Sequence, residues 1–355
     1  MFSGHNGVNT KETTMKKTLE KAAMAVTSSL IFASAALAEP VTLTYSSWVP
    51  WTHPINVALY IPWMETIEKE SGGSIKFKRL PKPVGSPPAH LDAVRTGQID
   101  AAFTVHGYAP KRFAAYLFAE LPMLGDTAVG TSIALQKTHE KFLADKNLYE
   151  GVHLIGMNTH GPGLIHHSKK FIMKPEDMKG QKMRTGGPIP LKLVEAWGGV
   201  PIRQPAPKSY EILSTGVADG ITFPFESLGS FKITKLVPFS TYIPGGLYSS
   251  SHYLFISKKK YEAMTPEQKA VIDKHSGVAF AEQAGKAWDL INDNGKKEML
   301  AAGNKIQIAP DSLVDEVKKL NVQWEGDYVK AATAAGHDGA AILQYFRDQV
   351  KALNK

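Results

Sequence analysis

The stretch VTLTYSSWVPWTHPINVALYIPWMETIEKESGGSIKFKRL, residues 41–80, begins with a β-rich alternation, continues with an amphipathic helical pattern and ends in a second alternation. The helical pattern runs from about Pro54 to Lys69, and Ser71-Gly72-Gly73 stops it. A short helix at residues 91–96 and a strand at residues 99–105 follow. This β-α-β-α-β order predicts a mostly parallel sheet with helices on its faces.

The rest of the chain alternates in the same way. Strands are expected near residues 152–157, 164–168, 218–223 and 252–257, with helices near 127–145, 189–197 and 209–214. Thr265-Pro266-Glu267-Gln268 is a helix start, and it predicts a long helix to about Ala302 with a kink at Gly277, Gly285 or Gly295. Two more helices, near residues 311–335 and 339–353, complete the chain.

A short motif occurs twice, as Thr96-Gly97-Gln98-Ile99-Asp100 and as Thr215-Gly216-Val217-Ala218-Asp219. In both copies a helix-ending glycine precedes a strand that contains an aromatic residue. The repeat favours two similar lobes, each ending a strand beside a common cleft. Coincidence between two ordinary helix-to-strand joints is the alternative.

The first 38 residues have the pattern of a leader. Basic residues from Met15 to Lys21 run into an apolar stretch that ends Ala36-Leu37-Ala38, which predicts a secretory signal cleaved after Ala38 and export to the periplasm. A membrane anchor is the weaker interpretation, because the stretch is short and contains several hydroxyl side chains. Residues 1–14 fit no part of a signal and are interpreted as a spurious or added extension.

Composition excludes several classes of site. The chain has no cysteine, so disulfides, thiolate metal ligands and cysteine nucleophiles are ruled out. Its net charge of +8 comes from scattered lysines without a basic stripe, which argues against nucleic-acid binding. The sequence lacks G-x-S-x-G, H-E-x-x-H, G-x-x-x-x-G-K-[ST] and G-x-G-x-x-G, so we expect no catalytic residue, metal or cofactor. His166 and His167 are adjacent on a predicted strand and would point to opposite faces.

A more specific signal lies at residues 174–185, KPEDMKGQKMRT, which predicts one helical turn ended by Gly180 and then a short strand through Arg184. Gly198-Gly199-Val200-Pro201-Ile202, Tyr210-Glu211-Ile212-Leu213 and Gly216-Val217-Ala218-Asp219-Gly220 follow it in order. With these segments the sequence resembles the solute-binding proteins of TRAP transporters, the DctP-like family. The likeness extends over nearly all of the chain after residue 38.

The resemblance implies an α/β, two-lobed periplasmic-binding-protein (Venus flytrap) fold with a long helix linking the lobes. We assign residues 39–160 to lobe I, 161–260 to lobe II, and 261–355 to the long helix and the C-terminal helices. It also implies a small organic acid as ligand, the membrane subunits of a TRAP transporter as partners, and a monomer. Arg184 falls at the family's carboxylate-pairing position, and a guanidinium suits a carboxylate because it offers two parallel donors. A structural ion pair with Asp177 or Glu195 is the alternative.

Departures from the family pattern restrict the ligand. Phe223 stands where many sugar-acid and dicarboxylate binders have asparagine, and apolar residues replace a second basic residue near Gly163. We therefore favour an aromatic or other monocarboxylate, ahead of branched keto acids and short dicarboxylates. The candidate ligand-binding residues are Arg184, Phe223, Phe103, His106, Trp48, Trp51 and Phe225. For each aromatic residue, core packing is about as plausible as ligand contact.

Two other functions stay open at this point. One is a periplasmic lyase or hydrolase that uses His53, His106 or His252 with Asp100 or Asp219, although these acids are expected to cap local backbone. The other is a ligand-sensing adaptor that presents its closed form to a membrane receptor. The sequence does not separate such an adaptor from a transport component.

Overall fold

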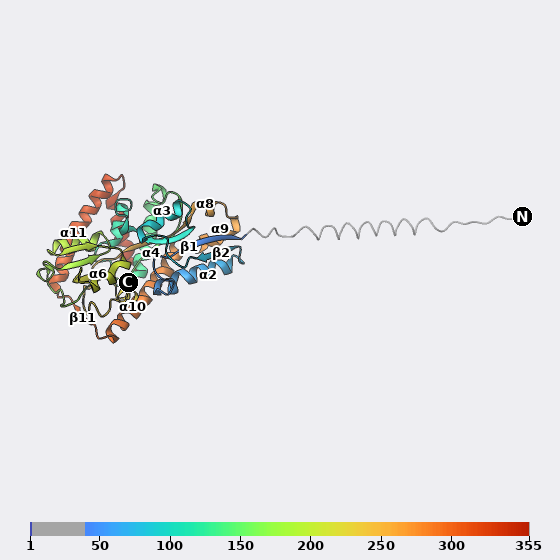
Figure 1. Ribbon diagram of the computed structural model, residues 1–355. Helices are drawn as coiled ribbons and strands as arrows, with labels where there is room; N and C mark the ends of the chain where they lie inside the picture. The colour runs from blue at the N-terminus through green and yellow to red at the C-terminus, as the bar shows by residue number, and fades with distance from the viewer. Residues whose placement is uncertain (2–39, 355) are drawn as a thin grey trace. The chain divides into compact units, whose positions relative to one another are not determined.

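The computed structural model describes Met1 and residues 40–354 (Figure 1). The predicted leader, signal peptide and cleavage after Ala38 therefore lie outside the described residues. Among the helices that are described, none combines the length and the apolar character needed to cross a bilayer.

The first lobe is built on a five-stranded sheet of order β2-β1-β3-β10-β4. Its strands are β1 (Val41–Ser46), β2 (Ile75–Arg79), β3 (Ala101–Val105), β4 (Val152–Thr159) and β10 (Ser251–Ser257). Strand β1 pairs parallel with both β2 and β3, and β10 runs antiparallel between β3 and β4. The helices α2 (Ile61–Glu70) and α3 (His90–Arg95) connect the parallel strands, as the β-α-β-α-β pattern predicts.

The second lobe contains a six-stranded sheet of order β11-β9-β5-β8-β6-β7. Its strands are β5 (Leu164–His167), β6 (Lys182–Thr185), β7 (Val200–Arg203), β8 (Gly220–Phe223), β9 (Phe239–Tyr242) and β11 (Lys305–Ile308). The helices α5 (Pro188–Ala196), α6 (Ser209–Ser214) and α7 (Glu226–Ser230) belong to this lobe. Strand β6 pairs parallel with β7 and β8, and β5 runs antiparallel to β8. The two sheets thus repeat one pattern of pairing.

The repeated T-G-x-x-D motif occupies the same place in both sheets. Asp100 accepts from the backbone N–H of Thr44 at 2.9 Å, and Asp219 accepts from that of Lys182 at 2.9 Å. In each case the carboxylate ties the start of one strand to its parallel neighbour. The aspartates therefore hydrogen-bond to the backbone. The far ends of the same strands, Val105 and Phe223, reach the space between the lobes.

The chain crosses between the lobes more often than the expected ranges allow. Strand β10 lies within the range 161–260 that was assigned to lobe II, but it pairs with β3 and β4 of the first sheet. An alternating pattern predicts that a segment is a strand, whereas the choice of partner depends on the complete fold. The boundary between the lobes is consequently discontinuous in sequence.

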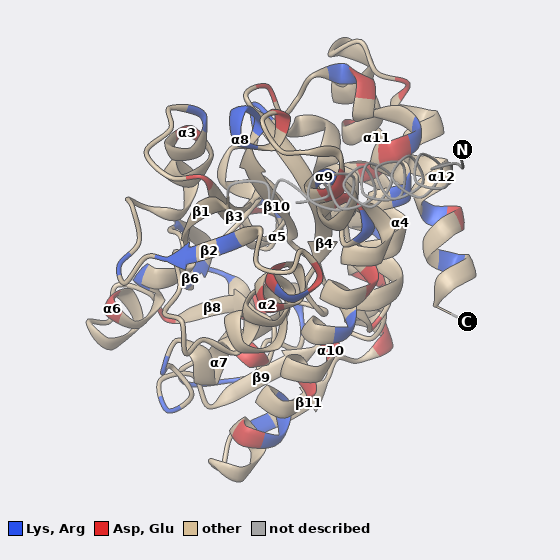
Figure 2. Cartoon of the chain, turned by 90° about the vertical axis from the view of Figure 1, so that its right-hand side faces the viewer, with Lys and Arg blue, Asp and Glu red and all other residues tan. Residues whose placement is uncertain are grey.

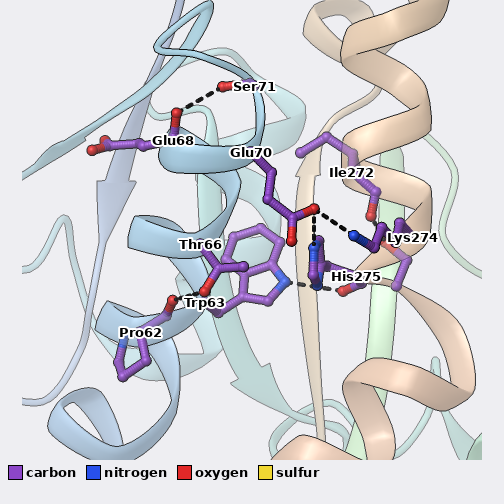
Figure 3. Close-up of polar contacts among 10 residues, drawn as sticks. Pro62, Trp63, Thr66, Glu68, Glu70, Ser71, Ile272, Lys274 and His275 are labelled. Carbon is purple, nitrogen blue, oxygen red and sulfur yellow. Dashed lines mark hydrogen bonds and ion pairs between the residues drawn. The ribbon is translucent and has the colours of Figure 1, made fainter.

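The predicted long helix is two helices, α9 (Pro266–Lys274) and α10 (Gly277–Ala301). The break falls at Gly277, whose φ of +60° is unfavourable for other residues. Figure 3 shows how α9 is held against α2: the Trp63 indole donates to the carbonyl of His275 at 3.0 Å, and Glu70 pairs with Lys274 at 2.8 Å.

Helix α10 packs against both lobes. Asp289 accepts from the N–H groups of Ala128 and Val129, at the first turn of α4 (Ala128–Phe142), at 2.6 and 3.1 Å. One turn along α10, Asn292 accepts from the N–H of Phe225 in the second lobe at 3.0 Å. The helix is therefore a common support for the two sheets.

The C-terminal helices α11 (Asp311–Ala334) and α12 (Gly339–Leu353) complete the core of the first lobe. Tyr328 and Phe346 are buried there against Phe118, with ring centroids 5.9 and 4.7 Å from it. In Figure 2 basic and acidic positions are interspersed along α10 and α11, so the positive charge does not form a stripe on these helices. The remaining short helix, α8 (Lys258–Glu262), follows β10.

Candidate ligand-binding site

A cavity lined by residues of both lobes lies between the two sheets. The first lobe contributes residues from β3 and its neighbouring loops, the second contributes the ends of β6 and β8, and α10 contributes Trp288. The lining residues are Trp48, His53, Ile55, Phe103, Val105, Tyr108, His160, Arg184, Gly186, Ala206, Phe223, Pro224, Glu226, Ser227, Phe231, Tyr248, Ser250, His252 and Trp288.

Arg184 lies at the end of β6 and is only 1% exposed. Its Nε donates to the carbonyl of Gln204 at 3.0 Å, and its guanidinium carbon lies 4.3 Å from the centroid of the Phe223 ring. Gly186 leaves room for the group, because a Cβ there would lie 3.1 Å from Nη2. The buried Nη2 finds no hydrogen-bond partner among the described residues. The side chain is thus fixed in place with donor capacity left for a guest.

The Arg184 charge has no carboxylate partner within the part of the chain that the structure describes. Asp177 accepts instead from the N–H groups of Met173 and Lys174, and Glu195 is exposed, so the alternative of an ion pair with either is not observed. Burial lowers the pKa of the Arg184 guanidinium, while Tyr108 and Tyr248 act in the opposite direction. A buried, unpaired cation costs several kcal/mol by rough estimate, and a bound anion would offset this cost.

Aromatic rings form much of the cavity wall. Trp48 packs on Phe103 with centroids 5.0 Å apart, and Phe231 stacks on Phe223 at 5.4 Å. The indole N–H groups of Trp48 and Trp288 are buried and lack partners among the described residues. Such walls suit a flat, apolar body that carries few hydrogen-bonding groups.

Tyr248 fills the region near Gly163, where the sequence has apolar residues in place of a second basic residue. A Cβ on Gly163 would lie 2.0 Å from Cε1 of the Tyr248 ring, so only glycine accommodates the ring in this position. Burial raises the pKa of Tyr248 above its usual value, and Arg184 opposes that rise. The ring therefore stays neutral beside the guanidinium and adds wall surface without adding charge.

The neutral histidines and one acid complete the polar part of the lining. Burial lowers the pKa values of His53 and His160 to about 4 and that of His252 to about 3. Burial also raises the pKa of Glu226 to about 7, against the effect of hydrogen bonds from Ser227 and Ser230. At neutral pH the histidines are uncharged, and Arg184 is the cation of the lining.

Four of the seven expected ligand-binding residues, Arg184, Phe223, Phe103 and Trp48, line the cavity. The other three face elsewhere. His106 follows Val105, which itself shares a side of β3 with Phe103, and so points to the opposite side. There it contacts Ser251 at 2.9 Å and Tyr149 at 2.6 Å.

Trp51 and Phe225 pack against protein away from the cavity. The Trp51 indole donates to the carbonyl of Leu80 at 2.7 Å, with its ring against Tyr45. The Phe225 ring lies beside Tyr242 and beneath the ammonium of Lys296. Proximity in sequence to a strand end placed these residues near the site but did not determine which way their side chains point.

Several lining residues have no local sequence pattern that indicates a ligand. Tyr108 comes three residues after the end of β3, the strand that carries Phe103. Tyr248 follows a loop and Trp288 is on a helix, and neither belongs to a local pattern that indicates a ligand. The polar and aromatic lining residues without such a signal are Tyr108, His160, Glu226, Ser227, Phe231, Tyr248, Ser250 and Trp288, and His53 and His252 were expected only for an enzyme.

The structure does not bring together the histidines and aspartates that the enzyme alternative requires. Asp100 and Asp219 bind backbone at the starts of β3 and β8, whereas His53 and His252 line the cavity at the opposite ends of these strands. His, Asp and Glu side chains in the described part of the chain do not gather into a group that could hold a metal.

Two similar lobes around an aromatic cavity with a buried cation define the class of bilobal solute-binding proteins. The family of bacterial extracellular solute-binding proteins, family 7 (DctP), matches residues 45–330. The chain belongs to this family, the periplasmic solute-binding proteins of TRAP transporters, which are transport components and not enzymes.

Related proteins, two of them of known structure, support the assignment. A TRAP periplasmic solute-binding protein from Bordetella bronchiseptica, with bound (R)- and (S)-mandelate, is 40% identical; the match covers 88% of this chain and all of that chain, with a TM-score of 0.85. A marine metagenome TRAP protein in complex with 3-hydroxybenzoate is 33% identical over 89% of this chain and all of its own, with a TM-score of 0.84. A protein of Comamonas testosteroni named outer membrane transporter protein TsaT is 29% identical over 312 residues, 88% of this chain and 92% of its own.

Proposed function

We propose that this protein captures an aromatic monocarboxylate in the periplasm and delivers it to the membrane subunits of a TRAP transporter. The observation that carries the proposal is Arg184, a buried cation that has no carboxylate partner among residues 40–354 and faces a cavity walled by aromatic rings. The bound mandelate and 3-hydroxybenzoate of the two related structures support the same ligand class. The ligand carboxylate pairs with the guanidinium, and the ring lies among Trp48, Phe103 and Phe223.

Ligand binding is tested by titration calorimetry with benzoate, mandelate and 3-hydroxybenzoate, and with galacturonate and succinate as comparison acids. We expect the aromatic acids to bind and to raise the melting temperature, because a ligand specific to the folded state stabilises it by mass action. Binding of the comparison acids in preference to the aromatic acids would contradict the proposal.

Replacing Arg184 with alanine tests the role of the cation. Truncating one member of a buried charge pair costs at least about 2 kcal/mol, so we expect R184A to bind benzoate at least about 30-fold more weakly. The free protein should melt at the same temperature or higher, since a buried charge has been removed. Arg95→Ala, which removes a surface arginine, is the matched control and should leave affinity unchanged. A large fall in the melting temperature of free R184A would indicate a structural role instead.

Export and delivery are further parts of the proposal. We expect the mature protein to begin at Glu39 and to be a monomer, which mass spectrometry of the periplasmic form and light scattering would check. Uptake of a labelled aromatic acid by vesicles that contain the cognate membrane subunits should require this protein. Uptake that proceeds equally well without it would contradict the role in delivery.

A further inference from the structure

The binding cavity has two distinct ends. Tyr108 and Gly186, beside Arg184, also border a hollow that is lined by Lys111, Arg112 and Arg203. His53 and Glu226 instead border a separate hollow together with Lys232 and Glu298. Arg184 lies against Gly186 at the first end and does not line the hollow at the second. A ligand held by its carboxylate at Arg184 therefore extends toward His53 and Glu226.

His53 presents a hydrogen-bond donor at the second end. The backbone N–H of Ile55 donates to Nδ1 of His53 at 3.2 Å, which requires Nδ1 to carry a lone pair. In the neutral imidazole the proton is therefore on Nε2. This Nε2 is buried and has no partner among the described residues, and the whole side chain is 6% exposed. The N–H is thus available to a group inside the cavity.

Glu226 presents the complementary acceptor. Ser227 Oγ donates to Oε1 of Glu226 at 2.5 Å and Ser230 Oγ donates to Oε2 at 2.9 Å, so the carboxyl is held in position from two sides. Each carboxyl oxygen has a further lone pair. The residue is 5% exposed and lies within the same two hollows as His53. A donor and an acceptor therefore face the same end of the site.

We infer that His53 and Glu226 together recognise a hydroxyl group on the ligand ring, remote from the carboxylate, so that the preferred ligand is a hydroxylated aromatic monocarboxylate. The inference rests on the proposed function and adds a specificity-determining pair to it. A hydroxyl matches the pair because it accepts from the His53 Nε2–H and donates to a Glu226 oxygen. A methyl group of similar size would leave the His53 N–H buried and unpaired, which disfavours its binding.

The first test compares ligands that differ only in this group. Titration calorimetry of the full mature protein with benzoate, 3- and 4-hydroxybenzoate, and 3- and 4-methylbenzoate should show one hydroxybenzoate binding roughly tenfold or more tighter than its methyl counterpart. Equal or better binding of the methylbenzoates, with benzoate also bound, would overturn the inference and leave the proposed function standing. Binding of none of the aromatic acids would overturn both.

Variants of the pair assign the preference to these residues. His53→Phe keeps a ring but removes the donor, and Glu226→Gln keeps the shape but replaces one carboxyl oxygen with an NH2 group, which donates and does not accept. We expect each to reduce the ratio of hydroxybenzoate to methylbenzoate affinity by roughly fivefold or more. His53→Gln restores an N–H donor and should recover part of the ratio. A ratio that is unchanged in both H53F and E226Q would overturn the inference, and melting curves of the free variants establish that each is folded.

Discussion

Glu226 lies in the wall of the site, and the pKa of its carboxyl group is shifted from the usual value. Burial raises its pKa from 4.5 to about 7, so the folded protein favours the protonated form. The contribution of Glu226 to stability is therefore fully present below about pH 4.5, and it is lost as the pH rises through about 7. His53 beside it stays neutral throughout this range, because its pKa is lowered to about 4.

We expect E226Q to become more stable relative to the wild type as the pH rises from about 5 to about 8. A shift of this size corresponds to a few kcal/mol at most, on the order of 3. Urea unfolding at several pH values measures the difference between the two proteins. The comparison is needed because burial also raises the pKa of Glu120 to about 7, and both proteins share that effect. A difference between the two curves that does not vary with pH would contradict the raised pKa of Glu226.

Individual residues also show how far the sequence alone could lead. Arg184 could be predicted from the family resemblance, and Phe103 and Phe223 could be predicted because they lie on strands whose ends meet at one cleft. Tyr248 could not be predicted, because its ring occupies space that is free only where Gly163, in another part of the chain, has no side chain. In the sequence, His106 is a ring-bearing residue near a strand end, as the lining aromatics are. Only the direction of its side chain, away from the cavity, distinguishes it from them.

Helix α10 shows why a glycine in the sequence does not by itself predict a break in a helix. The pattern offered Gly277, Gly285 and Gly295 as kinks, and only Gly277 breaks the helix. Gly285 and Gly295 are regular helical residues at close contacts: a Cβ would lie 2.4 Å from Cα of Val129 in one case and from Cα of Glu226 in the other. A sequence pattern identifies a glycine but not the backbone that approaches it.

These contacts predict that alanine at either position destabilises the fold. An isolated helix gains about 1 kcal/mol from Gly→Ala, but here the added methyl collides with backbone and overpacking costs roughly 1–3 kcal/mol or more. We expect G285A and G295A to lower the melting temperature, and G295A also to weaken ligand binding because it displaces Glu226. Gly326→Ala in α11 is the control, since a Cβ there meets nothing within 4 Å. Equal stabilisation of all three variants would refute the contact argument.

For the whole molecule, the two lobes are joined on one side by α10 and on another by contacts at the Arg184 end of the cavity. The backbone N–H of Ala206 donates to the Tyr108 hydroxyl at 3.1 Å, and Arg203 donates to the carbonyl of Gly107 at 3.1 Å. Both bonds join the first lobe to the second. Helix α10 contacts both lobes in this structure, and opening of the cleft would break the two bonds because they can exist only while the lobes are close together.

Tyr108→Phe therefore tests whether these contacts hold the site closed. The substitution keeps the ring in the cavity wall and removes one bond between the lobes, so opening becomes easier by about 1 kcal/mol. We expect ligand dissociation, followed by stopped-flow fluorescence of the tryptophans, to accelerate roughly fivefold, while the association rate changes little. Tyr210→Phe is the matched control because Tyr210 is exposed on α6. If Y108F slowed association instead and left dissociation unchanged, the hydroxyl would act on the open form, and the contact with Ala206 would not be the one that retains the ligand.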